Sequence, residues 1–200
     1  MTIMADLLKT PDLEEEKRLE FAGRIDQQVS RMTWLVRNLL TLSQLEADML
    51  KLKKEDIRMS SLIAKAIAPL ELMADVRNVE LHIDVDANIH LTCDAHWTVE
   101  AVSNIIKNCL EHTPAGGQVR IIGGQNNFST NLYICDNGEG IEKEEIGHIF
   151  ERFYKGKNAS ENSVGIGLAL ARQIVMQQNG TIEVKSEPGQ GTEFYLKWYG

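Results

Sequence analysis

The sequence has few cysteines, no long apolar run and a shortage of positive charge. Its three cysteines lie far apart and form no Cys-x-x-Cys pair, which argues against a disulfide framework and a zinc site. No run of 18 apolar residues occurs, so no membrane-spanning helix is predicted. With 21 basic and 29 acidic residues the net charge is −8, and bulk electrostatics disfavour binding to nucleic acid. What is present, 43% apolar and 25% charged residues, is typical of a globular chain.

A long amphipathic helix is predicted over residues 12–48. Pro11 and a run of acids form its first turn, where acids favour the positive end of the helix dipole. Apolar residues then follow at spacings of three and four, as in a heptad seam: Ala22, Ile25, Val29, Met32, Val36 and Leu39. A rod of about 55 Å cannot bury this stripe against the short helical stub predicted at 1–9. We expect it to pair with a second copy, and the alternative is packing on its own globular domain.

The rest of the chain has an α+β pattern that follows a polar hinge at residues 51–56. Helices are predicted over residues 60–75, 94–112 and 165–178. Strands are predicted over residues 79–85, 91–93, 119–122, 132–135, 181–186 and 192–198. Residues 155–163 form the one loop of low hydrophobicity.

One acidic motif directly follows a predicted strand. In Asp136-Asn-Gly-Glu-Gly-Ile the carboxylate at the strand end can accept a hydrogen bond from an amine such as that of adenine. Gly138 and Gly140 lack a Cβ, so a flat ring can approach the backbone. Taken alone, the motif is equally compatible with a simple turn.

Two further motifs suit phosphates and their counter-ion. Asn104 and Asn108 are four residues apart and present stacked amides, whose oxygens are hard ligands for Mg²⁺. Gly165 and Gly167 open a helix, where backbone N–H groups can cradle an anion. An ordinary surface helix and an ordinary helix start remain the alternatives for each motif alone.

As an ordered set, these motifs resemble the ATP-binding domain of sensor histidine kinases, whose Bergerat fold is shared with gyrase B and mismatch-repair ATPases. The N box is residues 104–114, the G1 box 136–141, the F box 150–154, the G2 box 165–168 and the last glycine turn 189–192. The resemblance implies a two-layer α/β sandwich at 57–200, a hinge at 51–56 and a partial dimerization hairpin at 1–50. The F box and the hairpin point to the two-component kinase branch.

The resemblance also implies roles for single residues. Asp136 would read the adenine amine and Asn108 would ligate Mg²⁺, while Asn104, Arg152 and Lys155 would act on the phosphates as catalytic groups. The remaining residues expected to contact ATP are Lys107, Gly138, Gly140, Ile141, Phe153, Tyr154, Gly165, Ile166, Gly167, Leu168 and Thr192.

The chain departs from the family pattern in three places. In this family the phosphoacceptor lies in a segment similar to His-Glu-Leu-Arg-Thr-Pro. None of the five histidines here begins such a segment, so we expect it upstream of Met1. A chain without it should bind ATP and Mg²⁺ and should not phosphorylate itself. The N box has Glu111 in place of its usual lysine, and Asn162 and Ser163 replace two glycines before the G2 box.

The expected partners follow from the same resemblance. They are ATP, a response regulator receiver domain and a second copy of the chain through residues 12–48, with no nucleic acid. The chain would be the cytoplasmic part of a sensor that reaches the membrane only through segments upstream. Two alternatives stay open: an anti-sigma-type serine kinase of the same fold, and a pseudokinase that signals by dimer geometry. The stimulus and the cognate regulator cannot be read from these residues.

Overall fold

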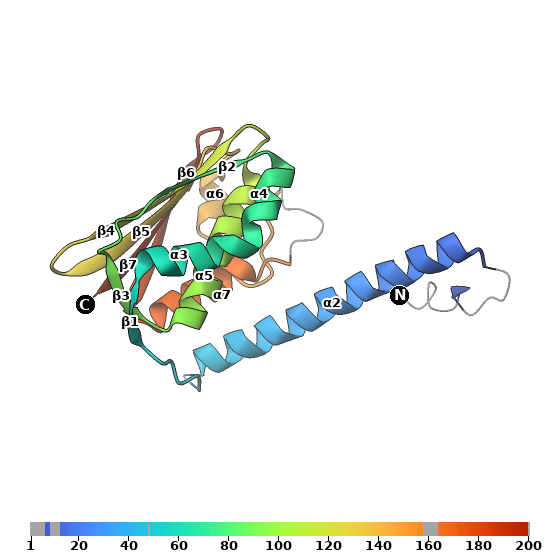
Figure 1. Ribbon diagram of the computed structural model, residues 1–200, viewed down its shortest axis with the longest axis horizontal. Coiled ribbons are helices and arrows are strands. Elements are labelled where there is room, and N and C mark those ends of the chain that lie inside the picture. The colour runs from blue at the N-terminus through green and yellow to red at the C-terminus, as the bar shows by residue number, and fades with distance from the viewer. Residues whose placement is uncertain (1–6, 9–12, 48, 158–163, 200) are drawn as a thin grey trace. The chain divides into compact units, whose positions relative to one another are not determined.

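The structure, a computed structural model, describes residues 7–8, 13–47, 49–157 and 164–199. It forms two compact units that divide between Ser43 and Gln44. Helix α2 (Glu15–Glu46) accounts for most of the first unit, as the heptad pattern predicts (Figure 1). Glu15 and Glu16 lie in its first turn, while Pro11 and most of the stub at 1–9 fall outside the described residues.

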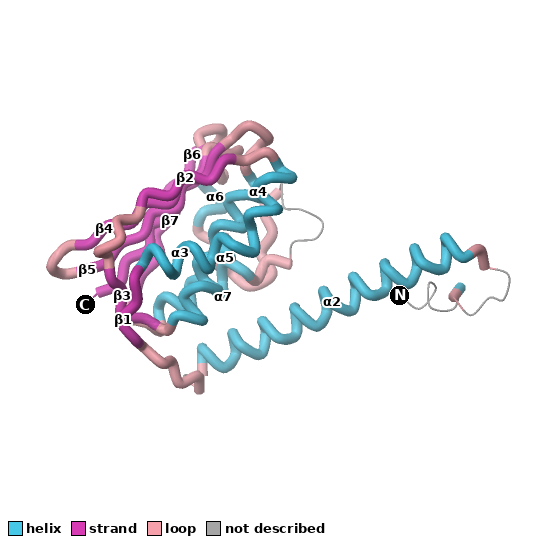
Figure 2. The backbone as a smooth tube through the Cα atoms, viewed as in Figure 1, coloured by secondary structure: helices cyan, strands magenta, loops and turns pink. Residues whose placement is uncertain are grey.

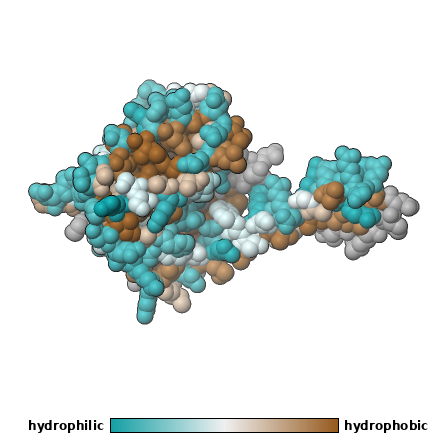
Figure 3. All heavy atoms as spheres, viewed as in Figure 1, coloured by the Kyte–Doolittle hydropathy of each residue, from teal (hydrophilic) through white to brown (hydrophobic). Residues whose placement is uncertain are grey.

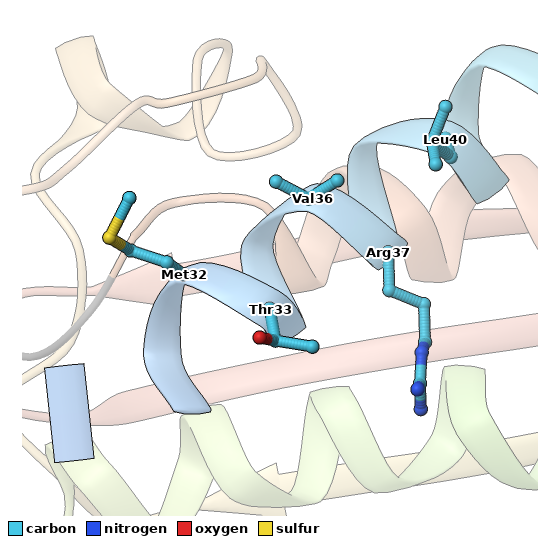
Figure 4. A pocket seen from close by; sticks show the side chains of 5 residues that line it. All are labelled: Met32, Thr33, Val36, Arg37 and Leu40. Atoms are coloured by element: carbon cyan, nitrogen blue, oxygen red, sulfur yellow. The ribbon is translucent and has the colours of Figure 1, made fainter. Parts of the chain in front are cut away.

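The apolar seam of α2 is open to solvent. Val29, Met32, Val36 and Leu40 are 49%, 51%, 54% and 59% exposed. Figure 4 shows the side chains of Met32, Val36 and Leu40 on one side of the helix, with that of Arg37 turned to the other, around a surface pocket that these residues line. The predicted stripe is therefore present, and its central residues Val29, Met32 and Val36 are exposed, while Ile25 and Leu39 are half-buried.

The second unit is built on a five-stranded mixed sheet (Figure 2). Its strands in spatial order are β2 (Glu80–Asp84), β4 (Gln118–Gln125), β5 (Ser129–Asp136), β7 (Gly191–Tyr199) and β6 (Gly180–Glu187). The pair β2 and β4 is parallel and the other neighbours are antiparallel. Strands β1 (Glu55–Arg58) and β3 (His90–Cys93) form a separate antiparallel pair.

Helices cover one face of this sheet (Figure 1). They are α3 (Met59–Ile67), α4 (Glu71–Arg77), α5 (Ala95–His112) and α7 (Gly167–Met176), with the short α6 (Lys143–Ile146) following β5. The core between the layers is fully buried and includes Ile105, Ile106, Ile121, Ile134, Ile174 and Phe194. This α+β sandwich confirms the predicted fold.

Two local predictions were wrong, and one short helix was missed. The helix expected over 60–75 is interrupted by a 3-10 turn at Ala68–Leu70, because Pro69 lacks the N–H that a continuous helix needs. Part of the expected hinge is strand β1, which pairs with β3. The short helix α6 was not predicted.

A buried polar network holds the start of α5. Asp94 caps the helix by accepting from the Trp97 N–H at 3.2 Å, and its second oxygen accepts from the Lys53 N–H at 2.8 Å. The Asp94 N–H donates to Gln178 Oε1 at 2.6 Å, and Gln178 also bonds Thr98. This network joins the segment before β1 to the end of α7.

Within the described ranges, no helix combines the length and apolar character that crossing a bilayer requires. On the second unit, apolar side chains reach the surface over the helix layer (Figure 3). Leu72 and Val76 of α4 are 74% and 79% exposed there.

Candidate functional site

Asp136 occupies the last position of β5 and is the buried acid of the site. The residue is 9% exposed. Oδ1 accepts from the Gly138 N–H at 2.9 Å and from the Thr192 N–H at 3.1 Å. The predicted G1 box and the last glycine turn therefore meet at one carboxylate.

Burial raises the pKa of Asp136 above its ordinary value. The N–H groups of Gly138 and Thr192 oppose this rise because their hydrogen bonds stabilise the ionised form, and the charge of His112 acts in the same direction. The result is a desolvated carboxylate that fixed donors keep available as a hydrogen-bond acceptor.

The glycines of the G1 box allow close packing of the backbone. A Cβ on Gly138 would lie 2.3 Å from the carbonyl oxygen of His112, and one on Gly140 would lie 2.1 Å from that of Glu187. Gly140 also has φ +70°, a conformation that side chains disfavour. These contacts place the G1 loop between the end of α5 and the β6–β7 turn, a reason for glycine that sequence reasoning did not give.

Two residues that position this loop were missed from the sequence. Ser186 Oγ accepts from the Ile141 N–H at 2.8 Å and donates to the carbonyl of Gly191 at 2.8 Å. Glu139 bonds His112 Nδ1 at 2.6 Å. Neither residue stands out by spacing or composition, because each contact depends on tertiary pairing.

The first asparagine of the N box meets the G2 box. Asn104 Nδ2 donates to the carbonyl of Glu100 at 3.0 Å. Asn104 Oδ1 faces the start of α7, where a Cβ on Gly167 would lie 3.0 Å away. The close approach of α5 and α7 thus depends on a glycine at the first position of α7.

The other N-box residues form the open polar side of α5. Asn108 is half-buried and Lys107 is exposed. Lys107 Nζ lies 3.8 Å from Glu111 Oε1, one turn later. Glu111 therefore occupies the position of the family's usual lysine, and Lys107 lies one helical turn before it.

The F box lies at the edge of the described ranges. Phe153 is 55% exposed with φ +63°, and its N–H donates to the Gly165 carbonyl at 2.7 Å. Tyr154 Oη donates to Glu145 at 3.1 Å. Arg152 pairs with Glu46 of the same unit. The structure therefore brings Phe153 and Gly165 together. The side chains of Arg152 and Tyr154 instead contact glutamates outside the predicted site.

The remaining predicted residues are placed as follows. Lys155 is exposed, Ile141 and Leu168 are half-buried, and the side chain of Ile166 is fully buried, which leaves only its backbone for a ligand. Asn162 and Ser163 lie outside the described residues. Chemically, the site offers an acceptor at Asp136, amide oxygens on α5 and backbone N–H groups at the start of α7.

The fold and sequence are similar to those of sensor kinases. YclK, a sensor histidine kinase of Bacillus subtilis, is 30% identical over 95% of this chain and 41% of YclK. The solved histidine kinase AdeS of Acinetobacter baumannii superposes with TM-score 0.79 at 22% identity, over 99% of this chain and 93% of the other. Histidine kinase ThkA, solved in complex with the response regulator TrrA, gives TM-score 0.72 at 17% identity, over 99% and 55%.

The chain spans less than half the length of curated relatives such as YclK. Neither the relatives nor the described geometry favours the serine-kinase or pseudokinase alternative. Residues 93–199, more than half of the chain, match the family described as histidine kinase-, DNA gyrase B- and HSP90-like ATPase. The match covers the N box, the G1 box and the G2 box, and ATP binding follows from it. The chain therefore belongs to this ATPase family, with sensor histidine kinases among its relatives.

Proposed function

We propose that this chain is the ATP- and Mg²⁺-binding part of a sensor histidine kinase, with Asp136 as the residue that recognises adenine. The observation that carries the proposal is a buried carboxylate held by two backbone N–H groups, 2.9 and 3.1 Å from Oδ1. A desolvated acceptor of this kind selects a ligand that donates a hydrogen bond. The exocyclic amine of adenine is such a donor.

Mg²⁺ fits the N-box face of α5. Among the described residues no group of three or more histidine, cysteine or acidic side chains could hold a metal. A single amide oxygen, that of Asn108, suits an ion that takes its other ligands from phosphates and water. When bound, Mg²⁺ neutralises phosphate charge, while Asn104 and the N–H groups at Gly165 and Gly167 hold the phosphate chain.

Catalysis by such a site depends on positioning and charge stabilisation. Lys107, Arg152 and Lys155 are the cations that we assign to the phosphate side. Since Arg152 is paired with Glu46, its action on the γ-phosphate requires that pair to open. In the whole protein the γ-phosphate would pass to a histidine and then to a response regulator. ThkA, solved with TrrA, is a relative that supports this partner.

The open seam of α2 supports a homodimer, since an exposed heptad stripe gains by pairing with its copy. In the whole protein we place this chain on the cytoplasmic side of the membrane. Both assignments rest on the resemblance and on the seam.

Titration calorimetry with Mg·ATP tests the binding proposal. The wild-type chain should bind, Asp136→Asn should bind at least about tenfold more weakly, and the matched variant Asp84→Asn, on the edge strand β2, should bind as wild type. Equal affinity of wild type and Asp136→Asn would overturn the adenine contact.

A second experiment tests the reaction. Labelled ATP should leave the chain alone unmodified, and label should appear on a histidine-bearing hairpin supplied in trans. Label on the isolated chain would contradict the expectation that this chain lacks a phosphoacceptor histidine.

A further inference from the structure

The end of α5 meets the G1 loop at one pair of residues. The N–H of Glu139 donates to the carbonyl oxygen of His112 at 3.3 Å, and the Glu139 carboxylate bonds Nδ1 of His112 at 2.6 Å. An ionised carboxylate only accepts hydrogen bonds, so Nδ1 carries the hydrogen of this bond. The two side chains are 29% and 38% exposed, which partly shields the contact from water.

Glu139 is also bonded to a third segment. The N–H of Gly189, in the turn between β6 and β7, donates to the Glu139 carbonyl oxygen at 2.7 Å. Because the glycines on both sides of Glu139 have no side chain, its carboxylate is what reaches from the centre of the loop to α5. Glu139 therefore joins α5, the G1 loop and the β6–β7 turn.

We propose that His112 and Glu139 form a positioning pair that couples the nucleobase side of the site to its phosphate side. Helix α5 carries Asn104 and Asn108, which we assign to the phosphates and Mg²⁺, and it ends at His112. The G1 loop begins at Asp136, which we assign to adenine. The pair holds these two groups of residues at a fixed separation. This inference rests on the proposed function, because it requires both assignments.

The expected consequence is a selective loss for ligands that span both sides. ATP is a tethered ligand: once its adenine is bound, its phosphates have a high effective concentration at α5, provided that the two sides keep the matching separation. Releasing the G1 loop from the end of α5 widens the range of separations and weakens ATP binding. Adenosine occupies only the nucleobase side and does not depend on that separation. A general folding defect would weaken both ligands alike.

Three variants separate the hydrogen bond from the charge. Glu139→Ala removes the side-chain acceptor and leaves the backbone bond to His112 in place. Glu139→Gln keeps an acceptor oxygen and loses only the charge. The matched control is Asp56→Ala, which breaks a second histidine–acid pair away from the site. In that pair, His90 Nδ1 lies 2.8 Å from Asp56 Oδ2, between β3 and β1.

The test measures binding of Mg·ATP by calorimetry and of adenosine by NMR titration, with thermal unfolding of each variant. Glu139→Ala should weaken Mg·ATP binding about fivefold and adenosine binding less than about twofold, because one hydrogen bond between the two sides is lost. Glu139→Gln and Asp56→Ala should bind both ligands within about twofold of wild type.

Three results would overturn the inference. They are equal losses for Mg·ATP and adenosine in Glu139→Ala, no loss for either ligand, and a glutamine variant that binds Mg·ATP as weakly as the alanine variant. If Glu139→Ala does not fold, His112→Ala removes the other partner, and the same comparison of the two ligands decides.

Asp136→Asn distinguishes failure of this inference from failure of the proposed function. Unchanged Mg·ATP binding in that variant defeats the proposed function itself. A loss in Asp136→Asn without a selective loss in Glu139→Ala defeats only the coupling by the His112–Glu139 pair.

Discussion

At the scale of single residues, Asp136 combines burial with fixed hydrogen-bond donors. Burial raises its pKa above the ordinary 3.8, and the donors only oppose that rise. An ionised group in this state costs folding free energy, which a ligand that donates to it can offset. The acid is therefore better explained by binding than by stability.

The first prediction concerns Asp136→Asn. At pH 7 the free variant should be at least as stable as wild type, because an amide avoids the cost of the buried charge, while ATP binding falls. Thermal unfolding with and without Mg·ATP measures both. A free variant that is clearly less stable would show that the charge supports the fold.

The second prediction concerns pH. Because the folded-state pKa of Asp136 is raised, protonation is easier in the folded than in the unfolded chain. The stability that this raised pKa contributes is fully present at a pH below the unfolded-state pKa. It is lost as the pH rises through the folded-state pKa. The stability of wild type relative to Asp136→Asn should therefore increase as the pH falls from 7 towards 3.8. Urea unfolding along this range measures it, and the opposite slope would contradict the assignment.

At the scale of elements, the G1 loop depends on backbone approach. Gly140 has φ +70°, and a Cβ there would lie 2.1 Å from the Glu187 carbonyl. Gly140→Ala should lower the free energy of unfolding by about 2–4 kcal/mol. Gly124→Ala on β4, where nothing lies within 4 Å, is the control and should change it by about 0.5 kcal/mol or less. Urea unfolding of both variants is the measurement, and equal effects would contradict the packing argument.

The polar network at the start of α5 makes a separate prediction. Gln178→Leu removes the acceptor of the Asp94 N–H, a bond of 2.6 Å at a residue only 2% exposed. The unpaired buried group should cost about 2–3 kcal/mol. The exposed Gln190→Leu should cost about 0.5 kcal/mol or less in the same unfolding measurement.

Sequence patterns predicted the elements whose signals are local. The heptad of α2, the helix expected over 94–112 and the strand expected over 192–198 each depend on signals within one segment, and all three elements are found. Strand β1 was missed because its residues are mostly polar and it forms only by pairing with β3.

The same distinction holds at the site. Asp136 and Asn104 stand in recognisable motifs, whereas Ser186 gains its role only when separate elements meet.

At the scale of the whole molecule, the open seam of α2 predicts self-association. Val36 lies in the centre of the seam and is 54% exposed. A charged side chain at this position would be buried in a dimer interface and would destabilise it. Val36→Glu should shift the chain towards monomer in sedimentation equilibrium, and Gln27→Glu, on the opposite side of the helix, should not. A wild-type chain that stays monomeric at high concentration would remove the argument.

The most direct test of the account is a crystal structure of this chain with Mg²⁺ and a non-hydrolysable ATP analogue. The account predicts the adenine amine within hydrogen-bond distance of the Asp136 carboxylate and the metal on the amide oxygen of Asn108. An adenine ring bound away from Asp136, with the metal on other side chains, would contradict it.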